Sequence, residues 1–231
     1  MHIRASGLTK HFGHRTIVKG ATLSVRPGEV ATIFGPNGAG KTTLIRMLAT
    51  LLRPTSGVLE IEGADALANP SAVRRALGVV VHEHLAYPTF SPYENLIFFG
   101  QMYGVEQLEH RATTLLTEVG LQRFIHEPLH IFSRGMTQRF MIARALLHHP
   151  SVLLLDEPFS GLDASAQQFV LERIAQERRK GTGIVVTTHN TALGYLVGTR
   201  FLFMINGELE EVAQKDEISA DTLLCTYEKN L

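Results

Sequence analysis

One segment of the sequence has the residue types and spacing to hold phosphate groups. It consists of Gly35, Pro36, Asn37, Gly38, Ala39, Gly40, Lys41, Thr42 and Thr43. Glycines let backbone N–H groups wrap around phosphate oxygens, and a helix that follows adds the positive end of its dipole. Lys41 would reach the β- and γ-phosphates, and the Thr42 hydroxyl would contact Mg²⁺. The segment therefore predicts a phosphate-binding loop for a nucleoside triphosphate with Mg²⁺.

Two carboxylates end a short apolar run farther along the chain. Asp156 and Glu157 follow Val152–Leu155. A buried strand with this composition delivers acidic residues at its carboxyl end, where open α/β sheets bind ligands. Asp156 would then hold Mg²⁺, and Glu157 could act as general base for an attacking water. The same pattern also fits a strand that ends in a solvated acidic pair, and the phosphate-binding loop favours the catalytic interpretation.

The elements that must position these residues alternate between strands and helices. Apolar or alternating runs predict strands at Ile3–Leu8, Ile17–Val25, Val30–Phe34, Gly57–Ile61, Val152–Leu155 and Gly183–Thr188, and a hairpin over Phe201–Val212 turning at Asn206 and Gly207. Helical spacing is found at Thr42–Leu52, Glu106–Val119, Met136–Leu147 and Ala164–Lys180. The order predicts an α/β core, interrupted by a helical region from about Ala86 to His149.

The bulk composition narrows the classes of partner. The 231 residues carry 22 basic and 22 acidic side chains, so no overall field favours nucleic acid, and we expect no nucleic-acid partner. The single cysteine, Cys225, cannot form an internal disulfide. The first thirty residues lack a signal-peptide pattern, and no apolar run approaches the roughly 20 residues of a transmembrane helix. We therefore expect a protein of the reducing cytosol that reaches any membrane from outside.

A third motif lies between the loop and the carboxylates. Residues 132–139 read Phe-Ser-Arg-Gly-Met-Thr-Gln-Arg, and this segment resembles the signature of the ABC ATPase family. The resemblance implies that Ser133, Arg134, Gly135 and Met136 contact the ATP bound by a partner chain, at the N-terminus of a helix. Arg134 and Met136 replace a glycine and a glutamine of the family pattern. The residues alone also fit a helix N-cap formed by Ser133.

Further positions match the family pattern. Residues 160–163 look like the family's D-loop, which implies a contact of Asp163 with the partner's nucleotide. His189 looks like the switch histidine, which would contact the γ-phosphate and act with Lys41 and Glu157 in catalysis. Phe12 occupies the position where the family stacks an aromatic ring on adenine, although a phenylalanine of the core fits the sequence as well.

The strand predicted at residues 77–82 departs from the family pattern. It ends in His82, where the family has a glutamine that contacts Mg²⁺. Imidazole can accept from water or ligate a metal, but it is shorter, bulkier and titrates near neutral pH. Glu83 or His84 could take over that contact. His82 and His84 alone lack the further ligands of a dedicated metal site.

Aromatic residues follow in the segment Tyr87–Leu96, where the family receives its membrane subunits. Tyr87, Phe90 and Tyr93 are the docking candidates, and burial within the helical region is the equally weighted alternative. His148 and His149 precede Pro150 and are predicted to lie on a solvated helix end.

The resemblance extends from Phe12 to Gly207 and covers nearly the whole chain. It implies one ABC ATPase domain over residues 1–231, with a P-loop NTPase (RecA-like) core. An N-terminal antiparallel β-subdomain joins this core within about 1–85 and 151–231, and an α-helical subdomain is inserted at about 86–150. The cofactors implied are ATP and Mg²⁺. The partners implied are a second copy, as a homodimer, and transmembrane permease subunits at the cytoplasmic face of a membrane.

The amino-acid sequence of several segments points to a narrower group within the family. Residues 132–136, 80–82, 94–99 and 102–104 resemble the ATPase of the haem exporter of cytochrome c maturation, and ABC-2 type export ATPases share parts of this wording. The resemblance implies ATP-driven export, with haem as the most specific cargo. Two alternatives stay open: a soluble, non-transport ABC ATPase of the iron–sulfur assembly type, and a nucleotide-dependent regulator without appreciable turnover.

Overall fold

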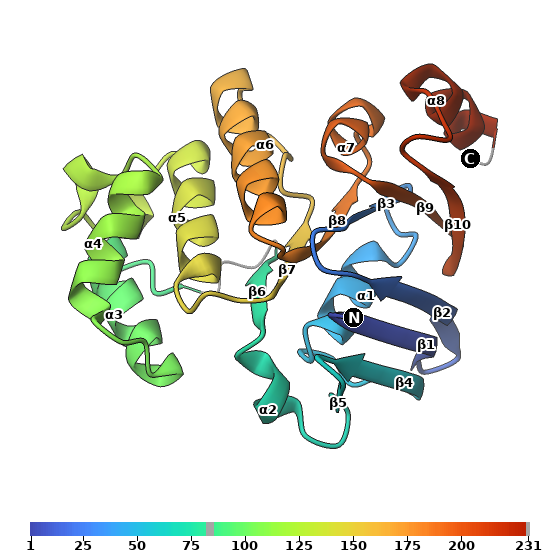
Figure 1. The fold of residues 1–231 in the computed structure, drawn as a ribbon, viewed down its shortest axis with the longest axis horizontal. Coiled ribbons are helices and arrows are strands. Elements are labelled where there is room, and N and C mark those ends of the chain that lie inside the picture. Colours follow the sequence, from blue (N-terminus) through green and yellow to red (C-terminus); the bar gives the residue numbers. More distant parts are fainter. Residues whose placement is uncertain (82–85, 230–231) are drawn as a thin grey trace.

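The computed structural model describes residues 1–81 and 86–229, and its centre is a six-stranded sheet (Figure 1). The sheet has the order β10-β9-β3-β8-β7-β6. Its strands are β3 (Val30–Phe34), β6 (Leu77–Val80), β7 (Val152–Asp156), β8 (Gly183–Thr188), β9 (Arg200–Ile205) and β10 (Glu208–Gln214). All neighbours pair in parallel except β10, which returns antiparallel to β9 through the predicted Asn206–Gly207 turn. The continuous apolar runs of β3, β7 and β8 are buried along their whole length, as parallel strands covered on both faces require.

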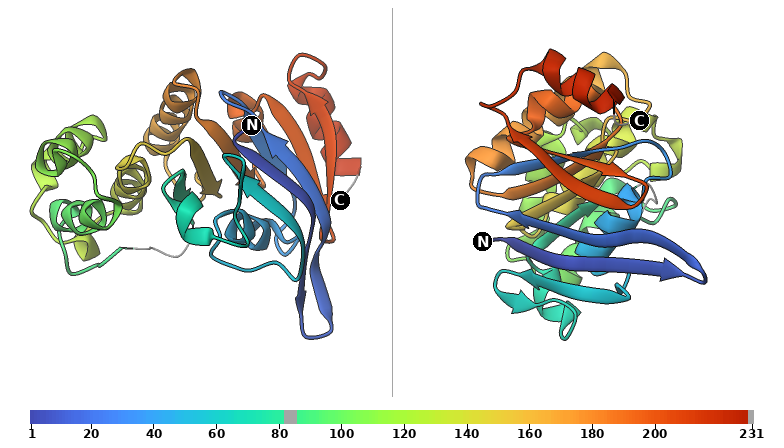
Figure 2. Two further views of the ribbon diagram at one scale, coloured as in Figure 1. Left: turned by 60° about the horizontal axis from the view of Figure 1, so that its bottom comes forward. Right: turned by 90° about the vertical axis from the view of Figure 1, so that its right-hand side faces the viewer.

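The N-terminal residues form a second, antiparallel sheet. Its order is β2-β1-β4-β5, with β1 (Ile3–Phe12), β2 (Arg15–Val25), β4 (Ser56–Ile61) and β5 (Ala64–Asp65). The turn between β1 and β2 projects from the rest of the molecule (Figure 2). Burial alternates along β1, because only one face of this sheet packs on the core.

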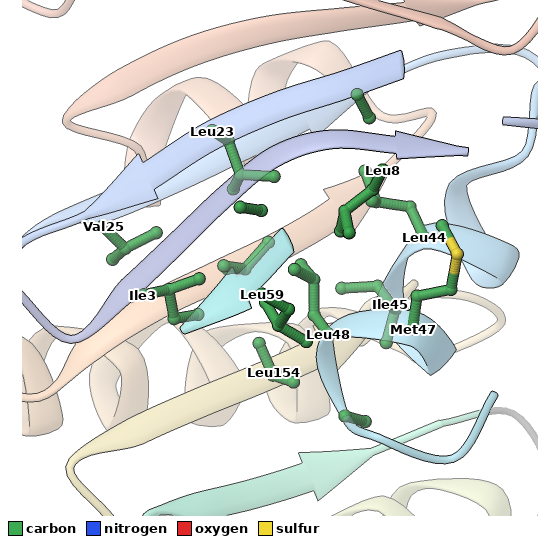
Figure 3. Packing of buried hydrophobic residues seen from close by; sticks show 14 of the residues in the cluster. Ile3, Leu8, Leu23, Val25, Leu44, Ile45, Met47, Leu48, Leu59 and Leu154 are labelled. Carbon is green, nitrogen blue, oxygen red and sulfur yellow. The ribbon is translucent and has the colours of Figure 1, made fainter. Parts of the chain in front are cut away.

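Helix α1 (Lys41–Leu48) fills the space between the two sheets. Its buried residues Leu44, Ile45, Met47 and Leu48 meet apolar side chains of both sheets, including Leu59 and Leu154 (Figure 3). This packing fixes the start of α1 relative to the strand that precedes it. The helix predicted over Thr42–Leu52 stops earlier than expected, and Thr50 has the left-handed φ of 57°.

The other face of the six-stranded sheet is covered by helices. Leu153, Leu155, Ile184 and Val186 alternate with the residues that face α1, and they join a cluster with the helices of the inserted region. These helices are α3 (Pro92–Tyr103), α4 (Leu108–Glu118) and α5 (Arg134–Leu146), with α6 (Ala164–Arg179) beside them (Figure 1). Short 3-10 turns at Gln122–Phe124 and Leu129–Ile131 connect α4 to α5.

Outside the inserted helical region, three helices have no counterpart in the sequence prediction. They are α2 (Pro70–Arg74), α7 (Thr191–Val197) and α8 (Ala220–Lys229). Helices α7 and α8 pack on an aromatic cluster that contains Phe34, Phe203 and Tyr227. Phe34 is the last residue of β3, so these helices support the strand end from which the phosphate-binding loop departs.

The α/β core, the N-terminal antiparallel sheet and the inserted helices are confirmed, whereas the prediction for His148 is wrong. The His148 ring stacks on Tyr103 at 4.0 Å between centroids, and its Nε2 lies 3.0 Å from the carbonyl oxygen of Leu77. Burial lowers the pKa of His148, while His149 is exposed. Among the described residues, no helix combines the length and apolar character that crossing a bilayer requires.

Candidate nucleotide-binding and hydrolysis site

The predicted motifs meet at the carboxyl ends of three adjacent parallel strands. The phosphate-binding loop follows β3, Glu157 follows β7 and His189 follows β8. The strands lie in the order β3-β8-β7, and the register pairs Phe34 with Thr188 and Thr187 with Asp156. Because parallel strands end at the same edge of a sheet, residues far apart in the sequence become neighbours.

The phosphate-binding loop has a backbone that requires glycine. Gly40 has a φ of 106°, and a Cβ atom there would lie 2.8 Å from the carbonyl oxygen of Ile17. Gly40 is also the N-cap of α1, without a side-chain hydrogen bond to the first turn of the helix. Residues 36–43, Ile17 and Glu157 line a cleft of about 330 Å³. The N-terminus of α1 and its backbone donors thus open onto a cleft that suits an anion.

Lys41 lies within this loop and is only 6% exposed. Its ammonium donates to the carbonyl oxygens of Gly35 at 2.6 Å and Pro36 at 3.2 Å. It also lies 3.2 Å from Oε1 of Glu157, a distance that suits an ion pair. That carboxylate oxygen is buried and has no hydrogen-bond partner in the described chain, because the approach of the lysine lacks hydrogen-bond geometry. A buried oxygen with free accepting capacity fits a water or another proton donor at this position.

Glu157 is held between Lys41 and His189. Its Oε2 lies 2.9 Å from Nδ1 of His189, and its backbone N–H donates to the carbonyl oxygen of Thr187 at 3.0 Å. The residue has a φ of 49°, a conformation that costs a non-glycine residue of order 1–3 kcal/mol and occurs at functional sites. The structure thus brings Lys41, Glu157 and His189 into one chain of contacts.

Asp156 is held by a neighbour, Thr187, for which no role was predicted. Its Oδ1 accepts a hydrogen bond of 2.6 Å from the Thr187 hydroxyl, and both residues are buried. The only sequence signal for this contact is that both residues lie at or next to the carboxyl end of a buried strand. Thr42 lies partly exposed on the first turn of α1. A carboxylate and a hydroxyl are oxygen donors of the kind that suits Mg²⁺, so the side chains present fit that ion.

The C-terminal helix also reaches the surroundings of this site. Burial raises the pKa of Tyr227 on α8, and the negative charge of Glu157 adds to this effect. The Tyr227 ring packs against Phe203 at 5.3 Å and against Phe34 at 6.2 Å, directly before the loop.

The predicted signature segment begins helix α5. Ser133 is the N-cap, and its hydroxyl accepts from the backbone N–H of Met136 at 3.3 Å. The helix starts at Arg134, two residues earlier than its apolar spacing predicted. Ser133 and Arg134 are exposed, whereas Gly135 and Met136 are half-buried. The N-cap interpretation is therefore confirmed.

Asp163 and Phe12 both lie on the surface. Asp163 is the N-cap of α6 and accepts from the backbone N–H of Ala166 at 2.8 Å. Phe12 ends β1 at the projecting hairpin and is 51% exposed, with Nζ of Lys10 5.2 Å from its ring centre. The alternative that Phe12 belongs to the core is wrong.

The docking candidates divide into two groups. Tyr87 and Phe90 are 44% and 40% exposed, and their rings lie 5.2 Å apart. Tyr93 instead turns inward, half-buried in the helical cluster with its ring against His126. Two exposed residues of α3 outside the predicted docking candidates, Phe98 and Met102, lie on the same side. The ring of Phe98 is 5.1 Å from that of Tyr87, and Met102 is one helical turn beyond Phe98.

His82, Glu83 and His84 lie outside the described residues. Their predicted contact with Mg²⁺ and the alternative of a separate metal site stay predictions.

Comparison with known proteins identifies relatives of this architecture. The family model described as "ABC transporter" matches residues 18–160, more than half of the chain. The linearmycin resistance ATP-binding protein LnrL of Bacillus subtilis is 33% identical over 218 residues, covering 94% of this chain and 70% of that protein. The Nod factor export ATP-binding protein I of Ralstonia nicotianae is 36% identical, covering 81% and 59%. A spermidine/putrescine import ATP-binding protein of Nitrosomonas europaea is 33% identical, covering 91% and 59%.

Solved structures agree with this result. The dimeric, post-hydrolysis structure of the ATP-binding cassette MJ0796 with ADP and Pi superposes with a TM-score of 0.83 at 25% identity, covering 92% of this chain and 98% of that one. The chain therefore belongs to the ABC transporter family, and within it to the ATP-binding subunits, which are ATPases.

Proposed function

We propose that this chain powers export across a membrane, and that two copies close on two ATP molecules to drive it. The observation that carries the proposal is the chain of contacts from Lys41 through Glu157 to His189 at the edge of the sheet. These three side chains supply a cation for phosphate, a carboxylate for water and a histidine that orients the carboxylate. This arrangement suits hydrolysis as well as nucleotide binding.

The residues of one chain have separate roles in the proposed reaction. Lys41 and the backbone of residues 35–43 bind the phosphates, and Glu157 orients the attacking water and takes its proton. His189 holds the Glu157 carboxylate and reaches toward the γ-phosphate. Thr42 and Asp156 would hold Mg²⁺, assisted by His82, and the ion would neutralise charge on the phosphate oxygens.

Completion of the site requires a second copy of the chain. A helix begins on the surface at residues Ser133, Arg134, Gly135 and Met136. Its positive end consists of backbone N–H groups, which can meet the γ-phosphate bound by the partner. Asp163 would contact the same nucleotide from its exposed position. The dimeric MJ0796 cassette supports this arrangement, since that structure is a dimer bound to ADP and Pi.

Phe12 is proposed to stack on adenine. Its ring is exposed at the end of β1, and Ile17 on the paired strand β2 lines the phosphate cleft. An exposed aromatic ring on the hairpin whose second strand lines that cleft offers the π-face that stacking on a base requires.

The permease is proposed to dock on an aromatic surface formed by Tyr87, Phe90, Phe98 and Met102. Their exposed fractions are 44%, 40%, 37% and 70%, and the three rings are linked through Tyr87. Aromatic and methionine side chains are enriched at protein interfaces. The chain would act as one ABC ATPase domain at the cytoplasmic face, with residues 86–150 as the helical subdomain that carries this surface.

Export is proposed from the sequence segments that resemble export ATPases and from the relative named as a Nod factor export protein. One of the relatives is an import protein, so the direction of transport should be tested first. The proposal that haem is the cargo depends only on the resemblance of these sequence segments. The iron–sulfur and regulator alternatives gain no support from the relatives reported above, whose names describe resistance, export and import proteins.

Substitution Glu157→Gln tests the proposed hydrolytic role. The variant keeps the size of the side chain but cannot take a proton from water, so we expect ATP binding to persist and turnover to fall by about 10²–10⁴-fold. We further expect ATP to trap the variant as a dimer in size-exclusion chromatography. Glu172→Gln, on the exposed face of α6, is the matched control. ATP turnover equal to that of the unmodified chain would contradict the proposed role of Glu157.

Transport itself is tested with everted membrane vesicles from the source organism. Vesicles with the unmodified chain should accumulate cargo on ATP addition, and vesicles with Glu157→Gln should not. Haem is the first cargo to measure. Uptake that requires the opposite vesicle orientation would show import and would contradict the proposed direction.

A further inference from the structure

Arg134, the residue that replaces a signature glycine, lies against the D-loop of its own chain. A Cβ atom on Gly161 would lie 2.2 Å from Nη1 and 2.3 Å from Cζ of Arg134. The guanidinium therefore occupies the space that a side chain at position 161 would need. Gly161 has a φ of 65°, so its backbone conformation also favours glycine. The pair fits together because one residue has a long planar side chain and the other has none.

A second contact joins the same helix to the segment just before this loop. Nε2 of Gln138, one helical turn after Arg134, donates to the carbonyl oxygen of Pro158 at 3.0 Å. Pro158 directly follows Glu157. Arg134, Gln138 and Glu157 also line one cleft of about 420 Å³ between α5 and the end of β7. Helix α5 is therefore attached at two points to the segment that carries the proposed general base.

The loop itself has a compact backbone that could transmit such a contact. The N–H of Ser160 donates to the carbonyl oxygen of Glu157 at 3.1 Å, and that of Leu162 donates to Phe159 at 3.3 Å. A shift of the backbone at Gly161 would also shift the backbone of Glu157, because only these short turns separate the two residues. A glycine at position 134 would have no side chain to reach the loop.

We infer that Arg134 is a positioning residue that couples the signature helix to the D-loop and Glu157 of the same chain. This inference rests on the proposed function, in which α5 meets the ATP bound by the partner chain. Helix α5 would then sense the nucleotide of the partner chain, while Glu157, which adjoins the loop that α5 contacts, serves the nucleotide of its own chain. Arg134 thereby links the two hydrolytic sites of a dimer.

Mixed dimers test whether Arg134 acts on its own chain or on the partner's nucleotide. One chain carries Glu157→Gln, so only the site with the intact Glu157 hydrolyses ATP. Arg134→Gly is placed either in the chain with the intact Glu157 or in the chain that supplies the signature to that site. We expect about a fivefold loss of turnover in the first arrangement and less than about a twofold loss in the second.

Each outcome of this experiment has one interpretation. A loss confined to the second arrangement, or an equal loss in both, would overturn the inference and assign Arg134 to the partner's phosphate or to general stability. If the unmodified chain neither dimerises with ATP nor hydrolyses it, the proposed function fails instead. Arg123→Gly, at an exposed arginine elsewhere in the helical region, is the control and should have no effect in either arrangement.

Hydrogen exchange provides a second measurement that does not depend on turnover. Arg134→Gly in the isolated chain should raise exchange at the amides of Ser160 and Leu162 by about fivefold, while the amides of β7 stay protected. Gly161→Ala should raise the same amides, because the methyl group displaces the guanidinium. Combining the two substitutions should give less than the product of their separate effects. Unchanged exchange at the D-loop in Arg134→Gly would contradict the coupling.

Discussion

The hydrolytic edge of the sheet and the aromatic surface of the helical region are built in opposite ways. At the edge, Lys41, Asp156 and Thr187 are at most 6% exposed, and charged or polar contacts hold each of them. On the aromatic surface, Tyr87 and Met102 are 44% and 70% exposed. Fixed polar groups suit chemistry, because their orientation costs little at the moment of reaction. Exposed apolar groups suit a partner, because burying them on association releases free energy.

The two regions also differ in the support beneath them. Three parallel strands set the positions of the hydrolytic residues through their register. The aromatic surface depends on one loop and on helix α3, whose first turn has a capping box between Ser91 and Glu94. Buried Asn95 fixes Tyr87 by hydrogen bonds of 2.9 Å and 3.0 Å to its backbone. Substitutions at the edge should therefore affect chemistry directly, and those on the aromatic surface should affect only what the chain binds.

Lys41→Met should have the largest effect. The substitution removes the cation beside the phosphate loop and leaves Glu157 without its charge partner, so ATP affinity should fall by about 100-fold, as expected for a charge-assisted contact. Isothermal titration calorimetry with ATP and Mg²⁺ measures the change. Lys19→Met removes an exposed lysine that pairs with Glu208 at the surface, and it should leave the affinity unchanged. Equal affinity in both variants would contradict the role of Lys41.

Thr187→Val tests whether the strand register matters for chemistry. The shape of the side chain is kept, but Asp156 loses its 2.6 Å hydrogen bond, which should lower stability by about 1–3 kcal/mol and turnover by about tenfold. Urea unfolding and the Mg²⁺ dependence of turnover are the measurements.

The matched control is Thr32→Val, in the same sheet and equally buried, where the hydroxyl donates to Gly194 instead. This control should lose stability but keep the Mg²⁺ dependence of turnover. A Mg²⁺ dependence that changes equally in both variants would show that Thr187 has no particular link to the metal site.

Combining Tyr87→Ser with Phe98→Ser should separate docking from chemistry. The turnover of the isolated chain should stay within about twofold, while its sedimentation with membranes of the source organism should weaken by about tenfold, because aromatic anchors dominate interface energy. Phe124→Ser removes another exposed aromatic ring of the helical region, 38% exposed, and serves as the control. Membrane binding that survives the double substitution would contradict the proposed aromatic surface.

The smallest expected effect concerns the pH dependence of stability. Burial lowers the pKa of His148 below its ordinary value of 6.5, so the unfolded chain binds more protons as the pH falls through that value. Stability should therefore decrease as the pH falls below about 7, until the pH passes the folded pKa. His148→Gln should reduce this dependence between about pH 7.5 and about pH 5.5 in urea unfolding.

His110→Gln, at an exposed position of α4, is the control for His148→Gln and should leave the slope unchanged. His149 is retained in both variants, because partial loss of its solvation also lowers its pKa. The difference between them therefore reports on His148 alone. If the free energy of unfolding depends on pH equally in the two variants, the stacking of His148 on Tyr103 does not depend on a neutral His148 ring.

The sequence by itself determined the fold class and the local motifs. Gly35 to Thr43 could be recognised because the loop is one continuous segment with its own backbone requirements. The hairpin at Asn206 and Gly207 and the apolar run before Asp156 are local in the same sense. Such features depend on neighbours within a few residues, so they need no knowledge of the remainder of the chain.

Only the tertiary structure decided which residues meet across the fold. The hydrogen bond from Thr187 to Asp156 depends on the pairing of β7 with β8, and the contact of Arg134 with Gly161 depends on where α5 lies. Tyr93 turns inward while Phe98 turns outward on one helix, because neighbouring helices cover one side of α3 and leave the other exposed. Burial is a property of the packed arrangement, so residue type and spacing could nominate these side chains without assigning their partners.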